Sequence, residues 1–173
     1  MPELPEIEIV RRSLLKLINK AKIIDIKIKN KNLRYKISKT LFNSLLKKQI
    51  IKISRKSKYL IFHFKKKLLL IHLGMSGKLF VVRQKDSLLF KTSFYYNSNI
   101  LKQHNHIFFF LNNGYTLIYN DVRRFGFFML YNTTAQEKIP FLKKLGYDPF
   151  NKKFNFKYFK NFIKNKKKIL KTY

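Results

Sequence analysis

The fold is decided by the stretch from Tyr59 to Leu73, which reads YLIFHFKKKLLLIHL. Two apolar runs of strand length, Tyr59–Phe64 and Leu68–Leu73, lie on either side of three lysines. This pattern predicts two antiparallel strands joined by a solvated hairpin connection. The tripeptide Asn112-Asn113-Gly114 predicts a second hairpin, because Asn-Gly favours the tight turns that join paired strands.

Short apolar or alternating runs recur on both sides of this hairpin. They predict further strands at Ile23–Lys29, Ile50–Ser54, Lys78–Val82, His106–Leu111, Tyr115–Asn120 and Phe127–Tyr131. Many short, closely spaced strands favour an antiparallel sandwich or barrel. Apolar residues at helical spacing predict an amphipathic helix over Glu6–Ile18, and Ser38 is a suitable cap for a short helix to Lys47. Residues 84–103 lack a clear period and are expected to form a long, mobile loop.

The composition changes after Leu145-Gly146-Tyr147-Asp148-Pro149 toward lysine, asparagine and phenylalanine. We therefore expect a domain boundary near residue 150, with residues 1–150 forming one domain and 151–173 the start of a helical second one. A helix there without its partners would expose apolar rings, which disfavours solubility. The rings concerned are those of Phe156, Phe159 and Phe162.

The chain has 39 basic residues against 8 acidic ones, a formal charge of +31. A hydrophobic content of 46% still predicts a folded protein. The excess of lysine over arginine is typical of an AT-rich genome, but that bias alone does not remove acids. A polyanionic partner is therefore expected, nucleic acid first and an anionic membrane surface second.

The composition also excludes several classes. The absence of cysteine rules out disulfides and a thiolate zinc site within this chain, and the four histidines are not spaced as metal ligands. No apolar run approaches the roughly 18 residues of a membrane-spanning helix, and no secretory signal is visible. We expect a cytoplasmic protein that does not enter membranes.

The N-terminus reads Met1-Pro2-Glu3-Leu4-Pro5-Glu6-Ile7-Glu8 and holds three of the eight acids. If Met1 is removed, Pro2 presents a secondary amine whose pKa of about 8 leaves much of it neutral. Such an amine can attack an aldehyde-like carbon and form an iminium, and a neighbouring carboxylate can move the protons. The plainer interpretation is that Pro5 and Glu6 start a helix. The two interpretations are compatible.

Four motifs stand out from the predicted strands. In chain order they are Pro2-Glu3-Leu4-Pro5-Glu6, Arg55-Lys56-Ser57-Lys58-Tyr59-Leu60, His72-Leu73-Gly74-Met75-Ser76-Gly77 and Asn120-Asp121-Val122-Arg123-Arg124-Phe125-Gly126. Together they resemble formamidopyrimidine-DNA glycosylase, the bacterial base-excision enzyme for oxidised purines. The resemblance runs through the whole chain, and the first and last motifs favour this branch over the endonuclease VIII group.

The resemblance implies a catalytic role for Pro2, whose amine attacks C1′ of the sugar, expels the base and forms an iminium. It implies that Glu3 moves the protons, that Glu6 is a further acid of the site, and that Lys58 assists the β-elimination that cuts the strand. Read alone, a lysine at the start of a strand is usually only solvated, and the match alone favours the catalytic role.

Three residues match those that fill the space left by a flipped nucleotide: Met75, Arg123 and Phe125. Methionine is an adaptable apolar wedge, phenylalanine can stack in a base step, and arginine can hydrogen-bond the orphaned base. Core packing is the plainer interpretation of the two apolar residues, but each lies close to glycine in a predicted turn. His104, Arg123 and Lys166 match DNA-backbone contacts, although Lys166, within a lysine run, also suits a solvated helix face.

The resemblance predicts an α+β, mainly β fold, a two-layer antiparallel sandwich flanked by helices. It implies a monomeric bifunctional glycosylase and AP lyase acting on double-stranded DNA with oxidised purines or abasic sites. Full-length members continue into a helix–two-turn–helix segment and a four-cysteine zinc ribbon, so no metal or other cofactor is expected in this chain. Val122 stands where the family usually has proline. The expected activity is impaired by truncation, and the alternatives are a non-catalytic DNA-binding module, half of a split enzyme, or a basic RNA-associated protein.

Overall fold

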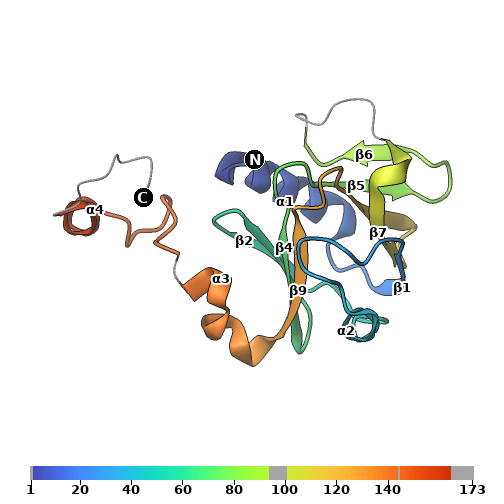
Figure 1. Cartoon of the computed structure of the whole chain (residues 1–173), viewed down its shortest axis with the longest axis horizontal. Helices are drawn as coiled ribbons and strands as arrows, with labels where there is room; N and C mark the ends of the chain where they lie inside the picture. The colour runs from blue at the N-terminus through green and yellow to red at the C-terminus, as the bar shows by residue number, and fades with distance from the viewer. Residues whose placement is uncertain (1, 94–100, 144, 165–173) are drawn as a thin grey trace. The chain divides into compact units, whose positions relative to one another are not determined.

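The computed structural model describes residues 2–93, 101–143 and 145–164. The chain forms two compact units, Met1–Lys143 and Lys144–Tyr173. The first unit is an antiparallel β-sandwich with helices at its periphery (Figure 1). This is the fold class that the strand pattern and the resemblance predict. The boundary expected near residue 150 lies inside the second unit.

The first unit begins with helix α1 (Leu4–Ile18), and the strands then alternate with turns and short helices. The remaining elements of this unit are β1 (Ile23–Ile28), α2 (Lys39–Asn43), β2 (Lys52–Lys56), β3 (Tyr59–His63), β4 (Lys67–His72), β5 (Lys78–Arg83), β6 (Leu89–Lys91), β7 (Asn105–Leu111), β8 (Tyr115–Asn120), β9 (Phe127–Asn132) and α3 (Pro140–Lys143), with 3-10 helices at Lys102–His104 and Thr133–Lys138. One sheet has the strand order β1-β7-β8-β5-β6 and the other has the order β2-β3-β4-β9.

The predicted hairpins are confirmed. Strand β3 pairs with β4 through the lysine connection, with Tyr59 opposite His72, and β7 pairs with β8 across the Asn-Gly turn. The strand β6 lies in the segment expected to be a loop, so that prediction was wrong there. Its three residues pair with β5, and a strand so short gives no readable period. Helix α2 is shorter than expected, and α3 was not predicted.

Helix α1 starts at Leu4, two residues earlier than its apolar period suggests. Glu3 is the N-cap, and a capping box joins it to Glu6. In this arrangement each residue satisfies a backbone donor that the helix leaves open. Proline is tolerated in the first turn, and the buried face of the helix consists of Ile7, Val10, Leu14 and Ile18.

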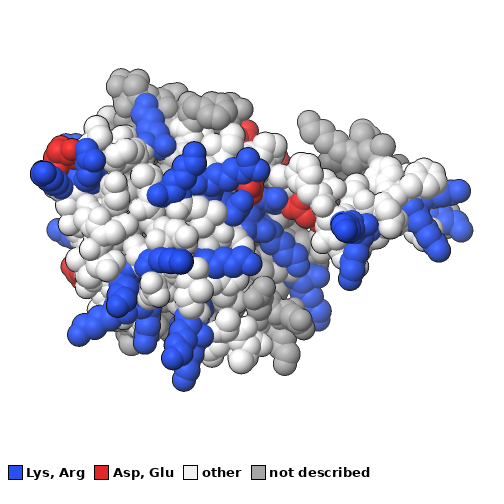
Figure 2. Space-filling model, turned by 180° about the vertical axis from the view of Figure 1, so that it is seen from behind, with Lys and Arg blue, Asp and Glu red and all other residues white. Residues whose placement is uncertain are grey.

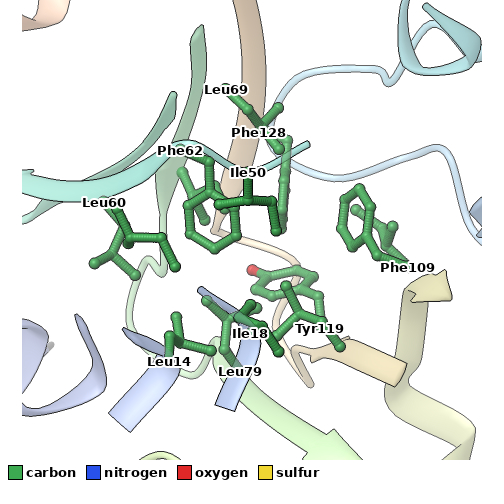
Figure 3. Close-up of a cluster of buried hydrophobic side chains, with 14 of the residues drawn as sticks. Leu14, Ile18, Ile50, Leu60, Phe62, Leu69, Leu79, Phe109, Tyr119 and Phe128 are labelled. Carbon is green, nitrogen blue, oxygen red and sulfur yellow. The ribbon is translucent and has the colours of Figure 1, made fainter. Parts of the chain in front are cut away.

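The core lies between the two sheets and the inner face of α1, and Figure 3 shows side chains from all three layers meeting there. Phe62 and Leu69 come from one sheet, Phe109 and Tyr119 from the other, and Leu14 from the helix. Each of these side chains is at most 2% exposed. Burial of such large apolar side chains is the dominant favourable term in folding, and it fixes the register of both sheets.

The second unit contains helix α4 (Phe156–Ile163), capped by Asn155, whose side chain accepts the N–H of Tyr158 at 2.9 Å. The helical tail predicted from the composition is confirmed for these residues. Its rings are exposed as expected, with Phe156 at 77% and Phe162 at 41%. Of the helices that the structure describes, none has the length and apolar character that crossing a bilayer requires.

Candidate active site and nucleic-acid interface

Two loops carry the residues expected to enter the DNA, and the sheet register places them side by side. The first loop joins β4 to β5 and the second joins β8 to β9, so both cross between the two sheets. His72 at the end of β4 lies opposite Phe127, and Lys78 at the start of β5 lies opposite Asn120. The loop with Met75 therefore begins and ends beside residues 121–126. We call these two segments the crossover loops.

Asp121 joins the crossover loops. Its side chain is fully buried and accepts hydrogen bonds from the hydroxyls of Ser76 at 2.5 Å and Tyr119 at 2.7 Å. It also accepts the backbone N–H groups of Gly126 at 2.9 Å and Arg123 at 3.2 Å. These four donors offset the cost of burying the carboxylate. The result is one hydrogen-bonded unit that spans both loops.

Glycines allow the backbones of the crossover loops to touch. A Cβ at Gly74 would lie 2.6 Å from the backbone nitrogen of Gly126, and the φ of Gly74 is +66°. A Cβ at Gly126 would lie 1.9 Å from the hydroxyl of Tyr119, and one at Gly77 would lie 2.1 Å from the carbonyl oxygen of Leu73. Side chains are excluded from these positions, so the spacing of the glycines in the two motifs has a packing cause.

The crossover loops present their larger side chains to solvent. Met75 is 49% exposed and Phe125 is 44% exposed, so neither belongs to the core. The guanidinium of Arg123 lies 4.5 Å from the ring centroid of Phe125, a cation–π contact. Val122, which replaces the usual proline, is 54% exposed. Met75 and Phe125 are thus exposed apolar side chains on a backbone held by hydrogen bonds, and side chains of this kind can insert between bases.

A second cluster lies at the N-terminus of α1. The Lys58 ammonium, in the turn between β2 and β3, lies 2.9 Å from the carboxylate of Glu3. The Glu6 carboxylate accepts the backbone N–H of Glu3. Pro2 directly precedes Glu3 and is half-buried. The structure therefore brings together Glu3 and Lys58, which the resemblance assigns to catalysis, with the supporting acid Glu6, next to Pro2.

The two clusters lie at the same edge of the sandwich. Tyr59 follows Lys58 and pairs with His72, and the two rings are 5.0 Å apart. The Nδ1 atom of His72, the last residue of β4, accepts the N–H of Gly74 in the first crossover loop at 3.1 Å. Burial, with smaller contributions from the nearby cations Arg34 and Lys58, lowers the pKa of His72 below its usual 6.5. A neutral imidazole can accept that N–H.

Glu8 holds α1 against this edge. Its carboxylate accepts hydrogen bonds from Arg11 at 2.6 Å, Arg12 at 2.9 Å and Arg55 at 3.1 Å. The bond from Arg11 is the main cause that lowers the pKa of Glu8 to about 2, against the opposing effect of burial. Because Arg55 belongs to β2, the contact fixes the helix to the strand that leads to Lys58.

The two predicted backbone contacts outside these clusters differ in what the structure says of them. His104 is half-exposed, and its carbonyl accepts the N–H of Asp121 at 3.0 Å, so it lies beside the second crossover loop. Lys166 lies outside the described residues. Within the described ranges, no group of three or more histidine, aspartate and glutamate residues could hold a metal ion.

Sequence reasoning missed the residues that position the others. Asp121, Ser76 and Tyr119 were given no role, although the first two stand inside quoted motifs, and Glu8 was noted only as an acid of the N-terminal stretch. One signal for Asp121 was available, because a buried role is the simplest reason for an acid in a chain that has only eight acidic residues. Which donors would surround it depends on strand pairing, which the sequence does not display.

Comparisons with known proteins show which family this chain is similar to. Residues 1–128 match the family model of the formamidopyrimidine-DNA glycosylase N-terminal domain. The chain is 40% identical to the formamidopyrimidine-DNA glycosylase of Bartonella tribocorum, over 99% of this chain and 59% of that protein.

Solved structures give the same result. The Lactococcus lactis Fpg in complex with abasic-site DNA is similar with a TM-score of 0.82 and 32% identity, over 99% of this chain and 60% of that one. The complex of the same protein with DNA containing an N7-benzyl-Fapy-dG gives a TM-score of 0.76, over 94% and 55%. The chain thus spans about three fifths of the length of these relatives. On the family match and the shared fold, this chain belongs to the formamidopyrimidine-DNA glycosylase family.

Proposed function

We propose that this chain carries the catalytic domain of a base-excision enzyme that removes oxidised purines, such as 8-oxoguanine and formamidopyrimidines, from double-stranded DNA. The observation that carries the proposal is the ion pair of Glu3 with Lys58, at 2.9 Å, directly beside Pro2. The relatives that support it are named as formamidopyrimidine-DNA glycosylases, and two solved neighbours hold lesion or abasic-site DNA.

The proposed reaction begins after removal of Met1. The neutral amine of Pro2 attacks C1′, the bond from C1′ to the base breaks, and the base leaves with the electron pair. Glu3 takes the proton from the amine and delivers it to O4′ as the sugar ring opens, which leaves an iminium between Pro2 and C1′. The departing base takes a proton from solvent.

The iminium then makes the C2′ hydrogens acidic. Loss of one of them and departure of the 3′ phosphate break the strand, which is the lyase reaction, and Lys58 assists this elimination. The damaged nucleotide has to leave the stack first, at a cost of a few kcal/mol. The proposed role of Met75, Arg123 and Phe125 is to fill the space that it vacates.

Borohydride trapping tests the proposal. The protein is incubated with a duplex that contains one abasic site, and borohydride reduces the iminium to a stable amine that electrophoresis detects as a covalent adduct. We expect a strong adduct with the wild-type chain and a much weaker one with Pro2→Gly, because a primary amine can still condense with the sugar aldehyde but lacks the ring that fixes the direction of its lone pair. The matched control is Pro5→Ala, which leaves Pro2 in place.

Two outcomes would contradict the proposal. One is a mass spectrum in which Met1 is still attached, because the Pro2 amine is then part of a peptide bond. The other is a wild-type chain that binds the duplex without forming the adduct. That result would favour the rival hypothesis, a non-catalytic DNA-binding module or half of a split enzyme.

A further inference from the structure

The seven arginines of this chain divide into two groups. In the first group, each guanidinium lies within 3.1 Å of a carboxylate. The pairs are Arg11, Arg12 and Arg55 with Glu8, and Arg83 with Asp86. These four arginines are therefore occupied by contacts within the fold.

The second group consists of Arg34, Arg123 and Arg124, and all three line the same cavity. The cavity has a volume of about 600 Å³, and its other lining residues are Asn32, Leu33 and Phe125. Among the described residues, none of the three has a carboxylate partner and no lysine lines the cavity, although lysines far outnumber arginines in the chain. Figure 2 shows how widely lysine and arginine are spread over one face of the molecule. A cavity lined by arginine alone among the basic residues is therefore a distinct feature.

The fold brings these three guanidiniums together from two segments. The backbone N–H of Arg34 donates to the carbonyl of Gly126 at 3.3 Å, which fixes the loop after β1 to the second crossover loop. Arg124 has a φ of +58°, in the left-handed region that is unfavourable for a residue with a Cβ.

We propose that this arginine cavity binds phosphodiester groups of the DNA strands. Guanidinium groups form paired hydrogen bonds with phosphate oxygens, and the lining supplies no carboxylate that would repel an anion. Leu33 and Phe125 form the apolar part of the wall, which suits the sugar between two phosphates. Arg34 and Arg124 become the specific new contacts, beyond the backbone and base contacts already expected of Arg123.

The inference rests on the proposed function for its ligand, DNA, but needs none of the Pro2 chemistry. Fluorescence anisotropy with a labelled undamaged duplex measures binding over a range of salt concentrations. The test variant is Arg34→Gln with Arg124→Gln. The control, Lys27→Gln with Lys66→Gln, removes the same charge from exposed positions elsewhere. Thermal unfolding confirms that both variants keep the wild-type fold.

We expect the arginine variant to bind at least about tenfold more weakly at low salt. Its plot of log affinity against log salt should be shallower by about 1.8, because each lost phosphate contact removes about 0.9 from the slope. The control should lose much less of both. Equal losses in the two variants would overturn the inference, as would a wild-type chain that does not bind duplex DNA.

The two proposals fail in different ways. If Pro2→Gly binds DNA like the wild type and the wild type forms no adduct with borohydride, the catalytic proposal is wrong and the arginine cavity is unaffected. If the adduct forms normally with the arginine variant at equal affinity, the cavity proposal is wrong and the catalytic one stands.

Discussion

Asp121 provides the sharpest test of how the crossover loops are held. In Asp121→Ala the hydroxyl of Tyr119 and the backbone N–H of Gly126 both lose this buried acceptor. Loss of a partner for a buried donor costs about 1–3 kcal/mol each. The two donors from Ser76 and Arg123 are closer to solvent and add less. We therefore expect a loss of about 4 kcal/mol in the free energy of unfolding.

The measurement is thermal unfolding followed by circular dichroism. At roughly 2–4 °C per kcal/mol for a chain of this size, the midpoint should fall by about 8–16 °C. Asp121→Asn keeps one acceptor oxygen and should lose about half as much, which keeps the test valid if the alanine variant does not fold. The control is Asp86→Ala, which removes an exposed ion pair with Arg83 and should leave the midpoint nearly unchanged. A midpoint of Asp121→Ala close to that of the control would refute the reasoning.

Three further results are expected. Gly74→Ala should destabilise the fold by about 3 kcal/mol or more, because its Cβ would meet the backbone of Gly126. In Gly114→Ala the Cβ has no atom within 4 Å, so this variant should cost only about 1 kcal/mol of backbone strain. Comparable urea midpoints for the two variants would count against the packing argument. The folded-state pKa of Glu8, about 2, lies below its ordinary 4.5, so ionised Glu8 stabilises the fold above pH 4.5. The free energy of unfolding, measured with urea at several pH values, should therefore exceed that of Glu8→Gln by less and less as the pH falls toward 2. A difference that does not depend on pH would contradict this. Under the proposed function, Lys58→Gln should slow strand cleavage at an abasic site by at least about tenfold but still form the borohydride adduct. The control is Lys66→Gln, which changes an exposed lysine of the β3–β4 turn and should cleave like the wild type.

Much of the architecture could be predicted because its causes are local. The lysine-linked strands β3 and β4 and the Asn-Gly turn between β7 and β8 depend on patterns within a few residues. Strand β6 was missed because three residues carry no period, and α2 was predicted too long because a suitable cap says where a helix can start and not where it ends. The start of α1 was misplaced since the apolar period begins only after the capping box.

The motifs determined by themselves which residue types are available: a proline and two acids at the N-terminus, a lysine before β3, and exposed apolar residues beside glycines. Only the tertiary structure decided how they are arranged. The pairings of Tyr59 with His72 and of His72 with Phe127 bring segments more than 50 residues apart to one edge. Strand register comes from burial of both faces of the sandwich, a property of the whole core that no single segment records. The same register places Asp121 of the second crossover loop against Ser76 of the first and leaves three arginines around one cavity.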